Sequence, residues 1–92
     1  MITRETRLVA GSGTIFIDGT TEKTSLHHAT IEANEDTTFT SITGEDEDGN
    51  EIDLMVKFAM TGKTLKDGKM LYTSLDFFIT KIKLATGSIF VH

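Results

Sequence analysis

The densest group of side chains able to do chemistry is an acidic run around one glycine, Glu45-Asp46-Glu47-Asp48-Gly49-Asn50-Glu51. Calcium loops place carboxylate and amide oxygens at alternate positions beside such a glycine, so Asp46, Asp48 and Asn50 are candidate cation ligands. An EF-hand also needs flanking helices and a glutamate at its twelfth position, which counted from Asp46 is Lys57. A hairpin loop whose acids face water fits better. The sequence therefore predicts no metal site and no cofactor.

The rest of the sequence contains no complete motif for phosphate binding or catalysis. Gly62-Lys63-Thr64 imitates the end of a P-loop, but the glycine required five residues earlier is Lys57. His27 and His28 are adjacent, and neighbouring strand residues point to opposite faces, so the two cannot easily chelate one ion. The chain contains no Gly-x-Ser-x-Gly and no His-Glu-x-x-His motif. We therefore expect a protein that is not an enzyme.

Composition narrows the kind of protein further. A chain of 92 residues forms one small domain, and without cysteine its stability must come from packing or from assembly with other subunits. A net charge of −5 disfavours nucleic acid as a partner. No apolar run approaches the length of a membrane span, and the first residues do not resemble a signal peptide, so we expect synthesis in the cytoplasm and no membrane partner.

The charges are unevenly distributed along the chain. Nine acids and no base lie between Glu32 and Asp53, whereas six of the seven lysines lie between Lys57 and Lys83. This asymmetry fits complementary contacts between neighbouring copies, and it equally fits solvated loops and edge strands protected by lysine. Both interpretations stay open at this point.

The sequence predicts short β-strands as the elements that position the charged and polar side chains. Sixteen threonines, no proline and no sustained 3.6-residue apolar spacing predict an all-β fold. We expect a single small antiparallel β-sandwich or partly open β-barrel of about six to eight short strands. The clearest strand is expected at residues 52–60, where five apolar residues alternate with the others. The remaining strands are expected at residues 14–17, 27–33, 37–43, 70–75, 77–84 and 88–91.

The last third of the chain, residues 62–92, predicts a β-meander. Gly68 and Gly87 mark its two short turns, and the change of apolar phase along the strand at residues 77–84 suggests a bulge near Phe77 and Phe78. Its apolar residues include more hydrophobic surface than one small core requires, which fits a subunit interface as well as core packing. These residues are Phe77, Phe78, Ile89, Phe90 and Val91.

The chain divides into an N-terminal arm, residues 1–13, and a single all-β domain, residues 14–92. The arm begins polar, has a short apolar step at Leu8 and Val9, and ends in Gly11-Ser12-Gly13. An arm of this kind frays in a monomer or docks on a neighbour in an assembly, and the sequence does not choose between these outcomes.

Three phrases of the sequence carry a resemblance when they are taken together in this order. They are Glu35-Asp36-Thr37-Thr38-Phe39-Thr40-Ser41-Ile42-Thr43, Gly62-Lys63-Thr64-Leu65-Lys66-Asp67-Gly68-Lys69-Met70-Leu71-Tyr72, and Ile82-Lys83-Leu84-Ala85-Thr86-Gly87-Ser88-Ile89. In order and approximate spacing they resemble small structural proteins of tailed bacteriophages, crAss-like phages included, and among these the auxiliary capsid (decoration) proteins and related fibre-base domains. Related sequences often carry a proline where this chain has Lys66-Asp67.

The resemblance implies a non-enzymatic virion protein that binds the outer capsid surface and stabilises the lattice. Its partners would be the major capsid protein and copies of itself, and its location the virion. The alternative is a trimeric base of a head or tail fibre, or a receptor- or carbohydrate-binding domain. The candidate partner-binding residues, drawn from the arm and from the lysine-bearing strands, are Arg4, Arg7, Leu8, Val9, Lys57, Lys81 and Lys83.

Overall fold

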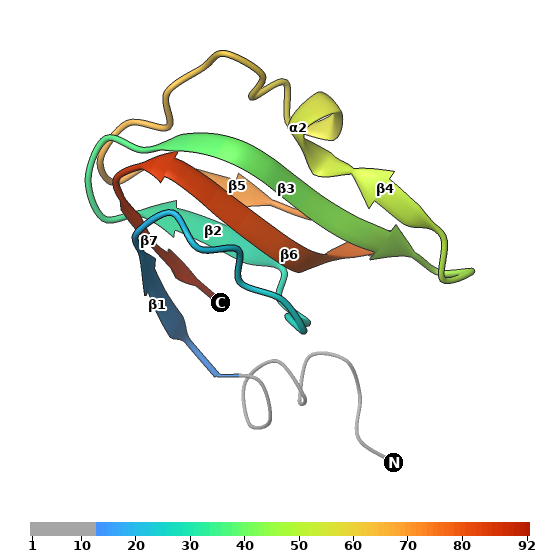
Figure 1. Ribbon diagram of the computed structural model, residues 1–92. Helices are drawn as coiled ribbons and strands as arrows, with labels where there is room; N and C mark the ends of the chain where they lie inside the picture. Colours follow the sequence, from blue (N-terminus) through green and yellow to red (C-terminus); the bar gives the residue numbers. More distant parts are fainter. Residues whose placement is uncertain (1–12) are drawn as a thin grey trace.

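A computed structural model describes residues 13–92 of the chain (Figure 1). These residues form seven strands and one short helix. The expected arm, residues 1–13, lies outside the described residues except for Gly13. The elements in order are β1 Ile15–Asp18, β2 Thr30–Ala33, β3 Thr38–Asp46, β4 Glu51–Asp53, α2 Leu54–Lys57, β5 Met70–Tyr72, β6 Phe77–Thr86 and β7 Ser88–Val91.

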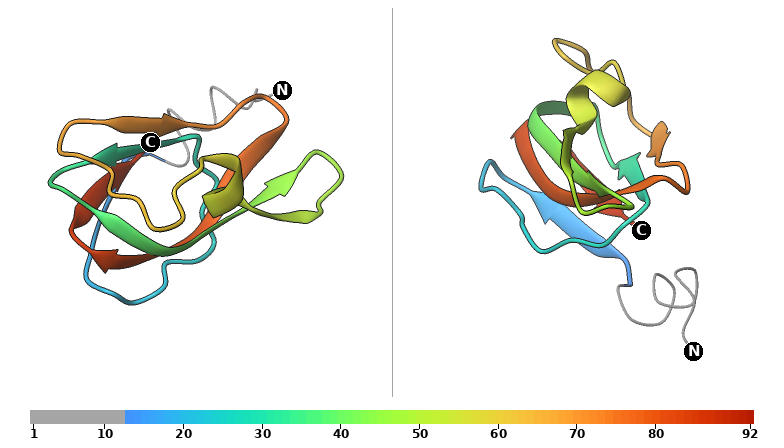
Figure 2. Two further views of the ribbon diagram at one scale, coloured as in Figure 1. Left: turned by 90° about the horizontal axis from the view of Figure 1, so that it is seen from above. Right: turned by 90° about the vertical axis from the view of Figure 1, so that its right-hand side faces the viewer.

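The strands form two antiparallel sheets, a four-stranded one in the order β1-β7-β2-β5 and a three-stranded one in the order β4-β3-β6. Both sheets curve around a shared interior (Figure 2). Lys23 and His28 form isolated bridges with Ile82 and Ile79, so residues 23–28 run beside β6 before the chain enters β2 of the other sheet. This segment joins the sheets along one side. The expected all-β fold, a sandwich or partly open barrel, is confirmed.

The core lies between the sheets and is built from the inward positions of each strand. In β2, Ile31 and Ala33 are buried while their neighbours are partly exposed, as the two-residue period of a strand requires. Each fully buried aliphatic side chain contributes about 1.5–3 kcal/mol of hydrophobic free energy to folding. The largest fully buried side chains are Leu26, Ile31, Ile42, Leu54, Ile79, Ile82, Leu84, Ile89, Val91 and Thr37.

The acidic run forms a hairpin loop, as predicted, although its boundaries differ. β3 continues through Asp46 and pairs with β4, with Thr43 opposite Asp53 and Glu45 opposite Glu51. The turn itself is therefore confined to residues 47–50. Gly44, expected in the loop, lies within β3, where an added Cβ would clash with the Phe78 carbonyl and lie 2.8 Å from Leu54 Cδ1.

The single strand predicted at residues 52–60 is wrong, because the chain forms β4 and then turns into α2 at Leu54. The Asp53 side chain accepts a hydrogen bond of 2.9 Å from the Met55 N–H, which caps the helix. Leu54 and Met55 are both buried and Val56 is 71% exposed, which breaks the two-residue alternation expected of a half-buried strand. The alternation of apolar residues therefore did not reveal that a helix begins at Leu54.

The end of α2 explains why the helix stops after one turn. The N–H of Met60 bonds to the Met55 carbonyl, and the N–H of Ala59 bonds to the Val56 carbonyl. These two bonds form a Schellman motif, in which the residue after the cap adopts a left-handed conformation. Ala59 occupies that position with φ of 55°.

The predicted β-meander is also wrong, since no two of β5, β6 and β7 are neighbours in a sheet. β5 pairs with β2, β6 with β3, and β7 lies between β1 and β2. Only Gly87 separates β6 from β7, and even the shortest common hairpin needs a two-residue loop. With φ of 92°, Gly87 instead turns the chain from the three-stranded sheet into the four-stranded one.

A bulge does occur in β6, but at a different place from the one expected. Thr43 pairs with Lys81 and Gly44 with Ile79, so Thr80 is the extra residue. Buried positions shift accordingly from Phe77 and Ile79 to Ile82 and Leu84. Among residues 13–92, no helix is long and apolar enough to cross a membrane.

Candidate functional site: the outer face of the four-stranded sheet

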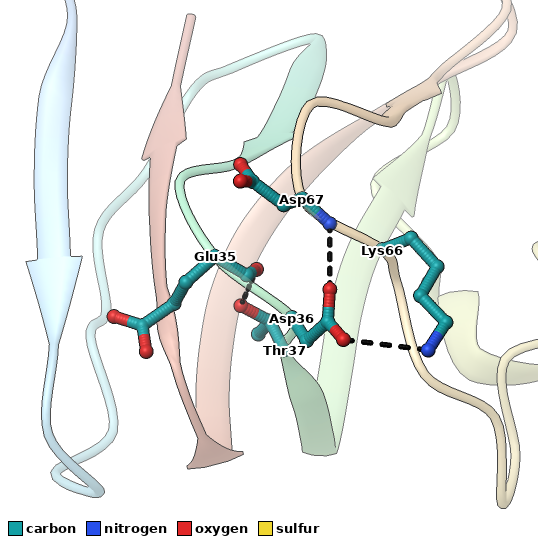
Figure 3. Close-up of polar contacts among 5 residues, drawn as sticks. All are labelled: Glu35, Asp36, Thr37, Lys66 and Asp67. Carbon is teal, nitrogen blue, oxygen red and sulfur yellow. Dashed lines mark hydrogen bonds and ion pairs between the residues drawn. The ribbon is translucent and has the colours of Figure 1, made fainter.

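The three phrases of the resemblance meet at one junction, where the β2–β3 turn contacts the segment before β5. Thr37 and Leu65 exchange backbone hydrogen bonds of 2.9 and 2.8 Å. Asp36 accepts the Asp67 N–H at 2.9 Å and pairs with Lys66 at 3.3 Å (Figure 3). The Asp67 N–H and, second, Lys66 lower the pKa of Asp36. The first and second phrases are thus fastened together.

The third phrase joins the same junction through Gly87 and Ser88. The buried Thr37 hydroxyl lies 2.8 Å from the Glu35 carbonyl oxygen and 3.1 Å from that of Ser88, so one donor serves two acceptors. A Cβ at Gly87 would clash with Thr37 Oγ1 and lie 2.7 Å from the Asp36 carbonyl. The recognisable residues therefore build the scaffold, and an interaction site must be sought elsewhere on the domain.

The outer face of the four-stranded sheet carries a band of aromatic and apolar side chains. The register places Phe16 beside Phe90, Phe90 beside Glu32, and Glu32 beside Met70 across the four strands. Phe16 is 49% exposed and Tyr72, next to Met70 along this face of β5, is 64% exposed. We call this surface the aromatic face, and it consists of Phe16, Glu32, Met70, Tyr72, Phe90 and His92.

Ring contacts hold the aromatic face in place. The rings of Phe16 and Phe90 lie 5.1 Å apart in a tilted arrangement, and Phe90 stacks on His92 at 6.5 Å. At the β5 end of the face, the Tyr72 hydroxyl donates to the Met70 sulfur at 3.1 Å. These contacts order the apolar side chains while leaving much of their surface in water.

A polar pair lies in the middle of the aromatic face. His92 Nε2 donates to Glu32 Oε1 at 2.9 Å, and His92 Nδ1 lies 3.0 Å from the Thr14 hydroxyl. Because a hydroxyl can donate or accept, the Thr14 hydroxyl satisfies the second ring nitrogen. The pair is thus satisfied within the domain. Aromatic residues and methionine are enriched at protein–protein interfaces relative to the rest of the surface.

The structure places two of the lysines predicted to bind a partner on one strand and the third on the helix. Lys81 and Lys83 lie two residues apart on β6, and Lys81 pairs with Glu51 at 3.5 Å. Lys57 lies on α2, not on a strand, with its ammonium 5.1 Å above the Phe77 ring. The other four predicted residues, Arg4, Arg7, Leu8 and Val9, lie outside the described residues.

The candidate cation ligands close the hairpin turn. Asp46 Oδ1 accepts the N–H groups of Asp48 and Asn50, both at 2.9 Å. The Asn50 N–H is the largest cause of a lowered pKa at Asp46. Residues 13–92 contain no group of three or more His, Cys, Asp or Glu that could hold a metal ion. The Asp46 carboxylate therefore stabilises the turn.

The two histidines precede β2, outside the strand in which the sequence had placed them, and lie in different environments. The His27 ring stacks on Phe78 with centroids 4.9 Å apart. His28 is buried, accepts the His27 N–H at Nδ1 and donates from Nε2 to the Gly13 carbonyl at 2.9 Å. His28 thus fixes the position at which the chain enters β1.

Comparison with protein families, curated proteins and solved structures found no match. Sequence reasoning had named only Phe90 of the aromatic face as surplus apolar surface. A signal for the rest was present in the alternation around β1 and β7, where Phe16 and Phe90 are out of phase with the buried Ile17 and Ile89. Their meeting on one face depends on the β1–β7 pairing, which the sequence does not show.

Proposed function

We propose that this protein is a non-enzymatic virion structural protein, an auxiliary capsid protein that binds the outer capsid surface through its aromatic face. The observation that carries the proposal is the exposure of Phe16 and Tyr72 on one ordered sheet face. The resemblance of the three phrases to decoration proteins supplies the class of partner, which is the major capsid protein of the same particle.

The aromatic face is small, which fits a protein that binds weakly as a single copy and is present in many copies on one particle. Strands 4.8 Å apart and three or four residues long give a face of roughly 250 Å². A stable complex between two proteins usually buries about 800 Å² on each partner. One copy therefore binds weakly, and the effect comes from many copies on one particle. Copies that bind the assembled lattice and not its dissociated subunits stabilise the lattice by mass action.

The test uses capsids that lack the protein. Purified protein is mixed with such capsids, and binding is measured by co-sedimentation while lattice stability is measured as heat resistance. We expect saturable binding at micromolar concentration and a higher disruption temperature. No binding at these concentrations would contradict the proposal.

A matched pair of variants tests the face itself. Phe16→Ser with Tyr72→Ser removes two exposed side chains of the aromatic face, and Val56→Ser with Leu75→Ser removes two exposed side chains elsewhere, which are 71% and 81% exposed. Interface aromatic residues each contribute about 1–2 kcal/mol or more when they are central to a contact. We expect the first variant to lose at least tenfold in affinity and the second to bind like the wild type. Equal losses would contradict the assignment.

The same exposed face favours one second candidate, a trimeric fibre base in which the aromatic faces pack against one another. Light scattering after size-exclusion chromatography separates the two functions. A monomer that binds capsids supports decoration, and a stable trimer with no affinity for capsids supports the fibre base.

A further inference from the structure

One side of β3 is only partly paired. On the side away from β6, Thr37 bridges to Leu65 just before the strand begins, and the ladder with β4 starts at Thr43. Between these points, residues 38–42 form no backbone hydrogen bond on that side with any other described residue. The chain from α2 to β5 arches away from this stretch (Figure 1). We call residues 38–42 the open edge.

A groove of about 570 Å³ lies at the open edge, within the usual size range of ligand sites. Its walls come from β3, β4, α2 and the turn after the helix. The lining is rich in hydroxyls and includes two carboxylates. The lining residues are Thr40, Ser41, Thr43, Glu51, Ile52, Asp53, Met55 and Thr61.

An exposed strand edge pairs readily with another extended segment, because its free N–H and C=O groups match those of a strand. Proteins commonly protect such an edge with lysine, proline or a β-bulge. The open edge has no lysine or proline, its register with β6 is irregular at Thr40, and its side chains are threonine, serine, phenylalanine and isoleucine. The two carboxylates of the groove favour a basic segment as the added strand.

We propose that the open edge binds the N-terminal segment of a neighbouring copy, residues 4–9, as an added β-strand. The segment reads Arg4-Glu5-Thr6-Arg7-Leu8-Val9 and carries a net positive charge in an acidic chain. Each groove carboxylate uses one oxygen within its own copy, Glu51 Oε2 for Lys81 and Asp53 Oδ1 for the Met55 N–H. The other oxygen of each carboxylate accepts no hydrogen bond from residues 13–92. In the proposed complex, these two oxygens accept hydrogen bonds from Arg4 and Arg7 of the neighbouring copy.

The position of Gly13 assigns the segment to a neighbour. His28 holds the Gly13 carbonyl, and residues 23–28 flank β6 on the side opposite β3. Along the sheet, three strand spacings, roughly 14 Å, separate this segment from a strand added beyond β3. The four steps from Val9 to Gly13 span at most about 14 Å, so reaching the groove of the same copy requires a fully extended chain without a turn, which favours a neighbouring copy. A neighbouring copy has no such limit.

Disulfide trapping tests the site, because the natural chain has no cysteine. Two full-length variants, Thr6→Cys in the segment and Thr40→Cys in the groove, are mixed under mild oxidation, and the mixed disulfide dimer is followed by non-reducing gel and mass spectrometry. The control mixes Thr6→Cys with Val56→Cys, which is 71% exposed on α2 and does not line the groove. We expect the Thr40 pair to link at least tenfold faster.

Charge reversal gives a second readout. Arg4→Glu and Arg7→Glu are added to the Thr6→Cys chain. Disulfide formation with the Thr40→Cys chain should then become as slow as with the Val56→Cys control. Equal rates for the Thr40 and Val56 pairs would overturn the proposal. A third variant carries both Thr6→Cys and Thr40→Cys in one chain. If it forms mainly an internal disulfide, the segment binds its own copy, and the proposal is also overturned. The assay needs no capsid, so its outcome is independent of the proposed decoration role.

Discussion

Replacing Gly87 by alanine tests the corner between the two sheets. Gly87 has φ of 92°, and an added Cβ would lie 2.8 Å from Thr37 Cα and would clash with Thr37 Oγ1. Atoms of the Thr37 backbone are not free to yield, because the Thr37 N–H bonds to Leu65 and its hydroxyl is within reach of two carbonyls. We therefore expect a large loss of stability from one methyl group.

The expected loss is the sum of two effects. Holding a non-glycine residue in this backbone conformation costs about 1–3 kcal/mol. Displacing Thr37 breaks a hydrogen bond in a fully buried position, which costs about 1–3 kcal/mol more. The total of about 2–6 kcal/mol is comparable to half the stability expected for a domain of this size, about 4–12 kcal/mol at typical values per residue.

Gly19→Ala is the matched control, because Gly19 also has a positive φ, 78°, but nothing lies within 4 Å of an added Cβ. It should lose only the backbone part of the cost, about 1–3 kcal/mol, without the cost of displacing a buried residue. Urea unfolding followed by circular dichroism measures both variants. With a slope near 1 kcal/mol per molar for a small protein, the Gly87→Ala midpoint should fall by roughly 2 M or more, or the protein should be unfolded without denaturant. Equal midpoints for the two variants would refute the steric argument.

Two further predictions concern α2 and the carboxylates. Ala59→Gly should raise the free energy of unfolding by about 0.5–1 kcal/mol, because glycine adopts the φ of 55° without strain, and thermal unfolding checks the direction. Asp36 and Asp46 have pKa values lowered below 3.8 in the folded protein, so the stability they contribute is present above that value and is lost as the pH falls through the folded pKa. In the double variant Asp36→Asn, Asp46→Asn, the midpoint of urea unfolding should therefore change less with pH between about pH 5 and pH 2 than in the wild type. The same change with pH in both proteins would contradict this assignment.

The sequence predicted the strands well where alternation reflects burial on one face. β2 follows the alternation of Ile31 and Ala33, and β7 begins at the expected Ser88. It failed at residues 52–60 because a period of two does not exclude a helix start. Asp53 as a cap and the adjacent buried pair Leu54 and Met55 decide the outcome, and burial is a tertiary property.

Sheet membership was the second failure, and its cause is the position of Gly87. A glycine between two apolar runs fits a hairpin turn and a sheet-to-sheet corner equally well. The corner is chosen by contacts far away in the chain, since Thr37 occupies the space beside Gly87. The same long-range pairing brings Phe16 and Phe90 together, so the aromatic face was not predictable from local pattern.

The most direct test of the central proposal is the affinity of the aromatic-face variant for capsids that lack the protein. We predict that wild-type protein and the Val56→Ser, Leu75→Ser control bind the particles equally, and that Phe16→Ser with Tyr72→Ser lowers the affinity at least tenfold without unfolding the domain. Undiminished binding by the folded aromatic-face variant would contradict the account.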